Sequence, residues 1–218
     1  LIFIHTSSRN VRQFPELTDG KEQVEEKLKA ETERFRTIWE KLTETFGCPI
    51  IQNNFEMPFY RLMGNRDASD YRGRRHFLER LNEAFYQYAE SHDNFYINDM
   101  EYLAADYGLK EWTNPYYWNM YKYCMCPDAI PAFAFSVAHI IKSIWGRNKK
   151  ALALDLDNTL WGGVIGDDGQ DGIDIGQENG VAQSYYEFQS YLKQLKPLGV
   201  LLTVDSKNEE ENAREGQI

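Results

Sequence analysis

The sequence predicts an α/β protein with parallel sheets, and three observations lead to that class. Short apolar runs alternate with longer segments whose apolar residues recur at helical spacing. A second alternation of the same kind follows a polar segment in the last third of the chain. The chain has 218 residues, of which 42% are hydrophobic, enough to bury ordinary cores. Strands that alternate with helices bury best as a parallel sheet covered by helices.

The first alternation starts in an apolar run and contains a long amphipathic helix that Gly47 ends. Strands are predicted at residues 1–4, 49–52 and 95–97, and helices at residues 24–46 and 78–88. A less regular, aromatic stretch at residues 112–123 then leads into a helix at about residues 128–145, with Pro131 in its first turn. We expect this part to be one α/β domain.

The polar segment Arg147–Lys150 predicts a hinge, so we divide the chain into domains at residues 1–147 and 148–218. Ala151–Leu154 is continuously apolar, which is typical of a central strand buried on both faces. A helix at about residues 181–195 and a strand at residues 199–204 complete the second alternation.

Composition limits the partners of the chain. The net charge is -10 and acidic residues are spread along the whole chain, so neither nucleic acid nor an anionic membrane is expected as a partner. Three cysteines give no disulfide framework, and no apolar run is long enough for a spanning helix. We therefore expect a cytoplasmic protein that binds small molecules or other proteins.

Two carboxylates, Asp155 and Asp157, stand where the apolar run Ala151–Leu154 ends. Residues two apart in an extended chain face the same side, and the carboxyl ends of parallel strands open onto ligand-binding crevices. In phosphoryl transfer one carboxylate attacks phosphorus, and a second protonates the leaving oxygen. A hard divalent cation must offset the repulsion between carboxylate and phosphate, so Mg²⁺ is the predicted cofactor, held by these two aspartates.

Two other interpretations of this motif explain it less well. A calcium loop that started at Asp155 would need Gly at its sixth position and Glu at its twelfth, where the chain has Leu160 and Gly166. A solvated surface turn does not explain the apolar strand before the motif. The catalytic interpretation is therefore favoured.

A second polar motif, Ser206-Lys207-Asn208, follows the predicted strand at residues 199–204. A hydroxyl and amides at the end of a strand are suitable donors to phosphate oxygens. By itself, Ser206 would equally suit a helix cap, with Glu209 completing a capping box. Because one strand-helix-strand unit separates Ser206 from Asp155 along the sequence, phosphate binding is favoured.

The run Leu154-Asp155-Leu156-Asp157-Asn158-Thr159-Leu160-Trp161-Gly162-Gly163-Val164-Ile165-Gly166 closely resembles the first motif of FkbH-like, subfamily IIIC members of the haloacid dehalogenase (HAD) superfamily. Ser206-Lys207-Asn208 matches the second motif of that family. The earlier part of the chain is more weakly similar to the SGNH-hydrolase-like domains that often precede such domains. The resemblance implies a partial Rossmann-like HAD core after a partial SGNH- or flavodoxin-like α/β domain.

By this resemblance, Asp155 is the nucleophile that forms an aspartyl-phosphate, and Asp157 is the general acid/base that also contributes a backbone oxygen to the Mg²⁺ site. Thr159 braces the phosphate-binding loop. Residues 161–174 form a short flap typical of members without an inserted cap domain, which leaves the site open to large substrates. FkbH-like proteins are associated with loading a glyceryl unit onto an acyl carrier protein, so such a carrier is an alternative partner.

The chain departs from these families in three ways. The third and fourth HAD motifs are expected after Ile218, so we expect residues 1–218 alone to be inactive. Asp205 stands where FkbH-like proteins usually have a cysteine. An SGNH hydrolase needs an early serine and an Asp-x-x-His pair, and no such pair follows Asp99. We therefore expect the first domain to be a non-catalytic or incomplete relative of these hydrolases.

Some other residues suggest chemistry but have simpler explanations. Cys124-Met125-Cys126 lacks the spacing of a metal or redox motif, and a packed turn is favoured. Asn53 and Asn54 follow a strand, where asparagine is a common turn residue. His5 is expected to be an interior histidine with satisfied hydrogen bonds.

The leading hypothesis is a Mg²⁺-dependent phosphatase or phosphotransferase that acts on a small phosphorylated metabolite. One alternative is a glyceryl transferase that loads an acyl carrier protein, and another is a non-catalytic scaffold that keeps the fold. The substrate, the pathway and the oligomeric state are not encoded in these motifs.

Overall fold

The computed structural model describes residues 1–208 and divides the chain into two compact units, Leu1–Trp145 (unit 1) and Gly146–Ile218 (unit 2). Each unit contains parallel strands joined through helices. The predicted α/β class with parallel sheets is therefore confirmed.

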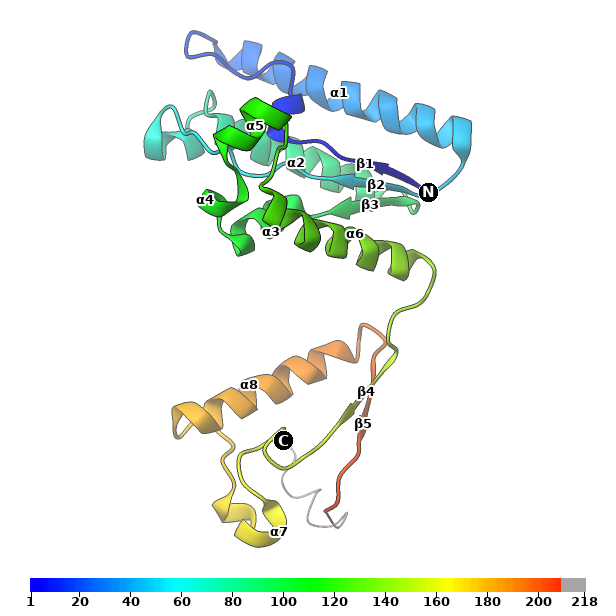
Figure 1. The fold of residues 1–218 in the computed structure, drawn as a ribbon, viewed down its shortest axis with the longest axis vertical. Helices are drawn as coiled ribbons and strands as arrows, with labels where there is room; N and C mark the ends of the chain where they lie inside the picture. The colour runs from blue at the N-terminus through cyan, green and yellow to red at the C-terminus, as the bar shows by residue number, and fades with distance from the viewer. Residues whose placement is uncertain (209–218) are drawn as a thin grey trace. The chain divides into compact units, whose positions relative to one another are not determined.

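Unit 1 contains a three-stranded parallel sheet (Figure 1). Its strands are β1 (Ile2–Ile4), β2 (Ile50–Asn53) and β3 (Phe95–Asn98), with β2 in the centre. Ile4 pairs with Gln52, and Gln52 pairs with Ile97. Because the strands are parallel and in this register, the residues that follow them meet at one edge of the sheet.

Helices follow each strand of unit 1, and Figure 1 shows α1 and α6 on opposite sides of the sheet. The helices are α1 (Lys21–Phe46), α2 (Arg74–Glu90), α3 (Met100–Tyr107), α4 (Leu109–Trp112), α5 (Pro115–Tyr121) and α6 (Ile130–Ile144). Short 3₁₀ turns lie at Ser8–Asn10, Gly64–Ala68 and Pro127–Ala129. None of the helices within residues 1–208 combines the length and apolar character needed to cross a membrane.

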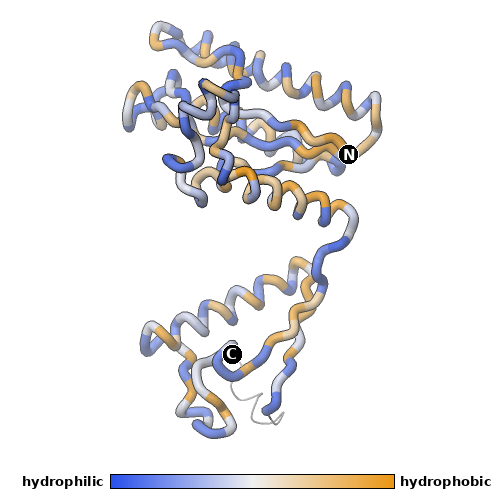
Figure 2. The backbone as a smooth tube through the Cα atoms, in the orientation of Figure 1, coloured by the Kyte–Doolittle hydropathy of each residue, from blue (hydrophilic) through white to orange (hydrophobic). Residues whose placement is uncertain are grey.

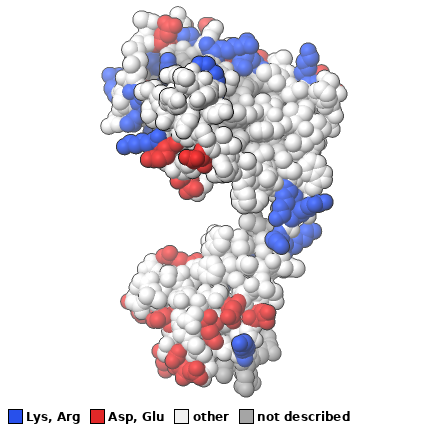
Figure 3. Space-filling model, viewed as in Figure 1, with Lys and Arg blue, Asp and Glu red and all other residues white. Residues whose placement is uncertain are grey.

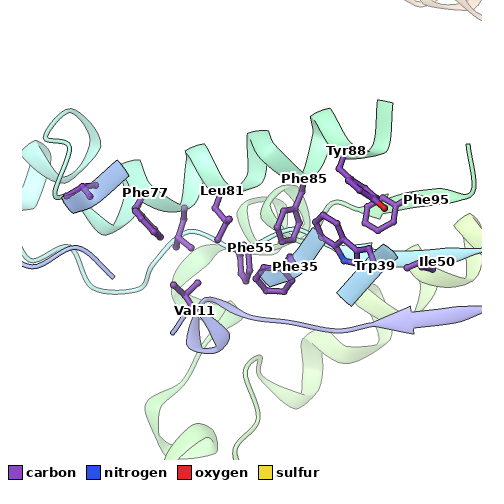
Figure 4. Packing of buried hydrophobic residues seen from close by; sticks show 12 residues of the cluster. Val11, Phe35, Trp39, Ile50, Phe55, Phe77, Leu81, Phe85, Tyr88 and Phe95 are labelled. Carbon is purple, nitrogen blue, oxygen red and sulfur yellow. The ribbon is translucent and has the colours of Figure 1, made fainter. Parts of the chain in front are cut away.

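An aromatic core joins α1 and α2 to the strands of unit 1 (Figure 4). Phe35 and Trp39 recur on one face of α1 and meet Phe85 of α2 at ring-centroid distances of 4.9 and 4.7 Å. Trp39 also donates a hydrogen bond from Nε1 to Oε1 of Gln52, 3.1 Å away. The helical spacing of these large side chains therefore fixes how α1 packs on the sheet.

A smaller cluster lies around α3 and α6 and contains Met100, Ala104, Trp112, Met125, Ala129 and Phe133. The stretch at residues 112–123, predicted to be irregular, contains helix α5. That helix begins with Pro115 in its first turn, and the Asn114 side chain accepts a hydrogen bond from the Tyr116 N–H. This local cap explains why seven residues with few apolar contacts still form a helix.

Unit 2 contains a two-stranded parallel sheet of β4 (Ala151–Leu154) and β5 (Leu201–Val204). Between them lie α7 (Ile165–Asp168), a 3₁₀ turn (Gln170–Gly172) and α8 (Gly180–Leu195). The Asn179 side chain caps α8 by accepting hydrogen bonds from two backbone N–H groups of its first turn. Leu192 of α8 packs against a cluster that includes Leu154 and Leu156.

The prediction that β4 is buried on both faces is wrong for the described residues. Leu154 is buried, but Ala151 and Ala153 are exposed, so only one face of the strand is covered. The covering comes from α8. In β5, Leu202 packs against this core, whereas Leu201 and Val204 are exposed. The strand is nevertheless apolar throughout, as the orange colour of β4 in Figure 2 shows.

Candidate active site

The candidate site lies at the carboxyl ends of β4 and β5. Leu154 and Val204 are paired in the register of the two strands, and the Asp205 N–H donates to the Leu154 carbonyl at 2.9 Å. Asp155 and Asp157 follow β4, and the Ser206–Asn208 segment follows β5. The two motifs, far apart in sequence, are therefore adjacent in the folded chain.

Asp157 is held by hydrogen bonds at both carboxylate oxygens. Its Oδ1 accepts from Nε1 of Trp161 at 3.1 Å and from the Ile165 N–H at 3.2 Å. Its Oδ2 accepts from Nδ2 of Asn208 at 2.9 Å, which connects the first motif directly to the second. These contacts fix the direction of the carboxylate while leaving it half-buried.

Asp155 has a different environment. Its side chain is exposed, and Oδ1 accepts a hydrogen bond from the Leu156 N–H at 2.8 Å. No lysine or arginine among residues 1–208 forms an ion pair with Asp155 or Asp157. The first carboxylate is thus open to solvent, whereas the second is oriented by its neighbours.

The backbone turns sharply after Leu156, which brings both carboxylates to the same edge. The Leu156 carbonyl accepts hydrogen bonds from the N–H groups of Thr159 and Leu160, at 3.1 and 2.8 Å. Asn158 has a φ of 54°, in the left-handed region that non-glycine residues adopt infrequently, and its Oδ1 accepts from the Gly163 N–H. Asparagine tolerates this region better than other residues with a side chain, because its short amide bonds locally.

The predicted flap at residues 161–174 closes on itself. Gly162 and Asp174 exchange two backbone hydrogen bonds of 3.0 and 2.8 Å. A Cβ atom on Gly162 would lie 3.0 Å from side-chain atoms of Asp174 and of Tyr185, so a larger residue here would force these neighbours to shift by a few tenths of an ångström. Trp161 is fully buried at the start of the flap, which explains why its indole can orient Asp157.

The predicted phosphate-binding residues are arranged less uniformly. Ser206 is half-buried, and its Oγ accepts from the Asn208 N–H at 3.2 Å. Thr159 is half-buried in the turn after Asp157, and Lys207 is exposed. The capping box with Glu209, considered above for Ser206, lies outside the described residues.

Unit 2 presents many acidic side chains, shown in red in Figure 3. From Ala151 to Leu192 the sequence has eight aspartates and glutamates and no lysine or arginine. No group of three or more His, Cys, Asp or Glu side chains suited to a metal ion occurs within residues 1–208. Asp155 and Asp157 therefore offer two carboxylates of a metal site rather than a complete ligand set.

Reasoning from the sequence missed two residues of this arrangement. Asn158 supports the turn, and Trp161 donates to the general-acid candidate. Both lie within the motif that carries the family resemblance, but a spacing argument that considers only ionisable groups gives an asparagine and a tryptophan no role.

Comparison with known proteins adds an independent finding. Neither the comparison with protein-family models nor that with curated proteins gave a match. Among solved structures, the chain is similar to the N-terminal part of protein BF1531 from Bacteroides fragilis, described as containing a phosphatase domain and complexed with Mg. The TM-score is 0.81 at 28% sequence identity. The match covers 91% of this chain and 52% of the other, so the chain spans about half the length of this magnesium-complexed, phosphatase-containing structure.

Proposed function

We propose that unit 2 carries the nucleophile-bearing part of a Mg²⁺-dependent phosphatase or phosphotransferase site. The similarity to a phosphatase-containing structure complexed with Mg supports phosphatase function in general. The observation that carries the proposal is the link between the two motifs, in which Asn208 donates to Asp157 while Asp155 stays open beside it. We propose a small phosphorylated metabolite as the substrate.

The two carboxylates have environments that suit two different roles. An attacking oxygen must reach phosphorus, and Asp155 is exposed at the strand end. An acid/base must keep one orientation relative to the leaving oxygen, and Asp157 is held by Trp161, Ile165 and Asn208. We therefore assign Asp155 as the nucleophile and Asp157 as the general acid/base.

The proposed reaction has two steps. A carboxylate oxygen of Asp155 bonds to phosphorus as the bond to the ester oxygen breaks, and Asp157 gives that oxygen a proton. Water then attacks phosphorus and gives its proton to Asp157, the bond to Asp155 breaks, and inorganic phosphate leaves. Transfer to an acceptor hydroxyl in place of water gives the phosphotransferase reaction.

The residues fit a magnesium ion. Hard oxygen ligands are those that Mg²⁺ prefers, and neither Asp155 nor Asp157 is neutralised by a lysine or arginine of the described chain. Both would contribute oxygen ligands. A bound Mg²⁺ would offset the repulsion between the nucleophile and the phosphate.

The phosphoryl oxygens are proposed to be bound by Thr159, Ser206, Lys207 and Asn208. Ser206 lies next to the Asn208–Asp157 link, and its hydroxyl proton remains free to donate while Oγ accepts from Asn208. The exposed ammonium of Lys207 and the hydroxyl of Thr159 are the further donors near this edge.

The experiment that tests the proposal is binding of beryllofluoride, a phosphate mimic, to the full-length protein with and without Mg²⁺. We expect Mg²⁺-dependent binding in the wild type and its loss in Asp155→Asn, which keeps the shape of the side chain. Asp167→Asn, an exposed carboxylate of α7, is the matched control and should bind like the wild type. Binding that is indifferent to both the metal and Asp155→Asn would contradict the proposal and favour a scaffold.

Membership of the HAD superfamily and of its FkbH-like branch stays a prediction from residues 154–166, and so does the SGNH-like character of unit 1. Loading of an acyl carrier protein is a separate prediction. It is tested by incubating the full-length protein with an acyl phosphate and a phosphopantetheinylated carrier protein. A gain in the mass of the carrier would contradict the assignment as a plain phosphatase.

A further inference from the structure

Unit 1 contains a second cluster of reactive side chains, formed by Cys124, His5 and Asn53. Nε2 of His5 lies 3.0 Å from Sγ of Cys124, and Nδ1 of His5 lies 3.0 Å from Oδ1 of Asn53. His5 follows β1 and Asn53 ends β2, so the cluster lies at the carboxyl edge of the unit 1 sheet. Cys124 reaches this edge from the loop between α5 and the 3₁₀ turn at Pro127–Ala129.

Hydrogen bonds around Asn53 fix the tautomer of His5. The Asn53 side chain is fully buried, and its Nδ2 donates to the backbone carbonyls of Thr6 and Asn54. Its Oδ1 therefore faces His5 and also accepts from the Thr6 N–H. An amide oxygen can only accept, so Nδ1 of His5 carries the proton and Nε2 presents a lone pair to the Cys124 thiol.

We propose that Cys124, His5 and Asn53 form a nucleophilic site that takes the acyl group of activated esters or thioesters. A thiol within hydrogen-bonding reach of a base that a third group orients is the arrangement that covalent acyl transfer requires. Cys124 is only partly buried, and His5 is exposed on one side while Phe133 packs against its ring at 5.1 Å, so a substrate can reach the sulfur.

The step conserves atoms and charge. As the bond from Sγ to the acyl carbon forms, the thiol proton passes to Nε2 of His5. The bond from the acyl carbon to the leaving oxygen or sulfur then breaks, and the leaving group departs as an anion or takes the proton from His5. The product is a thioester on Cys124, which water or an acceptor can later cleave with His5 again as the base.

Two neighbouring features are compatible with an acyl substrate. Asn98, which pairs with Asn53 in the sheet, has a buried Nδ2 without a hydrogen-bond partner among the described residues, so this edge holds an unused donor. Glu56 and Arg9, whose charges act on the thiol of Cys124, line a cavity of about 410 Å³. Aromatic side chains, including Trp118, form part of its wall and suit an apolar acyl group.

The test is reaction of the full-length protein with p-nitrophenyl acetate, with the acetylated cysteine identified by peptide mass spectrometry. We expect a burst of one equivalent of p-nitrophenolate and acetylation of Cys124, both lost in Cys124→Ala. Cys126→Ala is the matched control and should keep the burst, as should Asp155→Asn, which separates this site from the proposed phosphatase site. His5→Gln should slow the acetylation by about 10²-fold.

The pH profile separates a base from a structural histidine. Partial burial lowers the pKa of His5, and burial followed by the charge of Glu56 raises the pKa of the Cys124 thiol. If His5 is the base, the rate of Cys124 acetylation should not change with pH between the pKa of His5 and the pKa of the Cys124 thiol. An inflection caused by the titration of Glu56 should disappear in Glu56→Gln. A rate of acetylation that rises tenfold per pH unit throughout this range would overturn the proposal, as would equal labelling of Cys124 and Cys126. Both measurements use the wild type, so they do not depend on whether His5→Gln folds.

Discussion

The carboxyl ends of the strands carry opposite kinds of polar group in the two units. In unit 1 they are neutral amides, Gln52, Asn53 and Asn98, each fully buried. In unit 2 they are the carboxylates Asp155 and Asp205, both exposed. The same position in a parallel sheet therefore serves as a closed hydrogen-bonded network in one unit and as an open, charged edge in the other.

The difference follows from the cost of burial. An amide can leave water when its donors and acceptors find partners, as Gln52 does with Trp39, Thr6 and Asn53. A carboxylate without a cation cannot be buried at a similar cost, so it stays in solvent until an ion arrives. Unit 1 thus holds its site in place by packing, whereas unit 2 leaves room for a metal and a phosphate.

The largest expected effect comes from placing a charge in the closed network of unit 1. In Gln52→Glu, a carboxylate oxygen replaces the Nε2 that donates to Thr6 and Asn53, both at 2.8 Å. We expect the free energy of unfolding to fall by about 3–5 kcal/mol, measured by urea denaturation. Gln13→Glu, at an exposed position, is the control and should change it by less than about 0.5 kcal/mol. If Gln52→Glu and Gln13→Glu changed the free energy of unfolding equally, the amides of unit 1 would not form a network that excludes charge.

The second prediction concerns Glu56, a buried carboxylate of unit 1. Burial raises the pKa of Glu56 to about 7, despite hydrogen bonds from Ser8. Between its ordinary pKa and this value the folded protein keeps a proton that the unfolded chain releases, so rising pH favours unfolding. Relative to Glu56→Gln, the wild type should lose up to about 3 kcal/mol of stability between about pH 4.5 and 7.

This difference is measured by urea denaturation of both proteins across that pH range. Glu101, whose pKa burial also raises, is present in both proteins and cancels. A constant difference would mean that Glu56 has similar pKa values in the folded and unfolded states.

The smallest effect tests the open edge of unit 2. If Asp155 and Asp157 bind Mg²⁺, the ion should stabilise the folded state by about 1.4 kcal/mol at ten times its dissociation constant. The shift is measured as the change in melting temperature of the full-length protein on adding MgCl₂, with CaCl₂ in parallel. Asp155→Asn should reduce the shift, whereas Asp167→Asn should retain it. An equal shift in both variants would indicate binding elsewhere.

Much of the fold and of the aspartate site could be predicted because the information is local. Apolar periodicity gives α1, α2 and α8, and the two carboxylates lie in one short run after a strand. The exposure of Ala151 could not be predicted, since an apolar strand reads the same whether one face or both are covered. The hydrogen bond from Asn208 to Asp157 depends on the register of β4 and β5, which the sequence does not state.

The Cys124 cluster shows the opposite case. Its three members are separated by 48 residues between His5 and Asn53 and by 119 between His5 and Cys124, and each has an ordinary local explanation. The packed turn predicted around Cys124 agrees with the burial of Met125, yet it also delivers the thiol to the sheet edge. The expectation for His5 holds only in part, because both ring nitrogens have hydrogen-bond partners but the residue is exposed. Only the parallel sheet brings these residues together.

The two-stranded sheet of unit 2 also has a consequence for hydrogen exchange. The central strand β2 has a hydrogen-bonded neighbour on each side, whereas β4 and β5 pair only with each other among the described residues. Amide protons of β2 should therefore exchange with solvent only when unit 1 unfolds as a whole. Those of β4 can exchange through the separation of a single strand pair, so they should lose their protection first as denaturant is added.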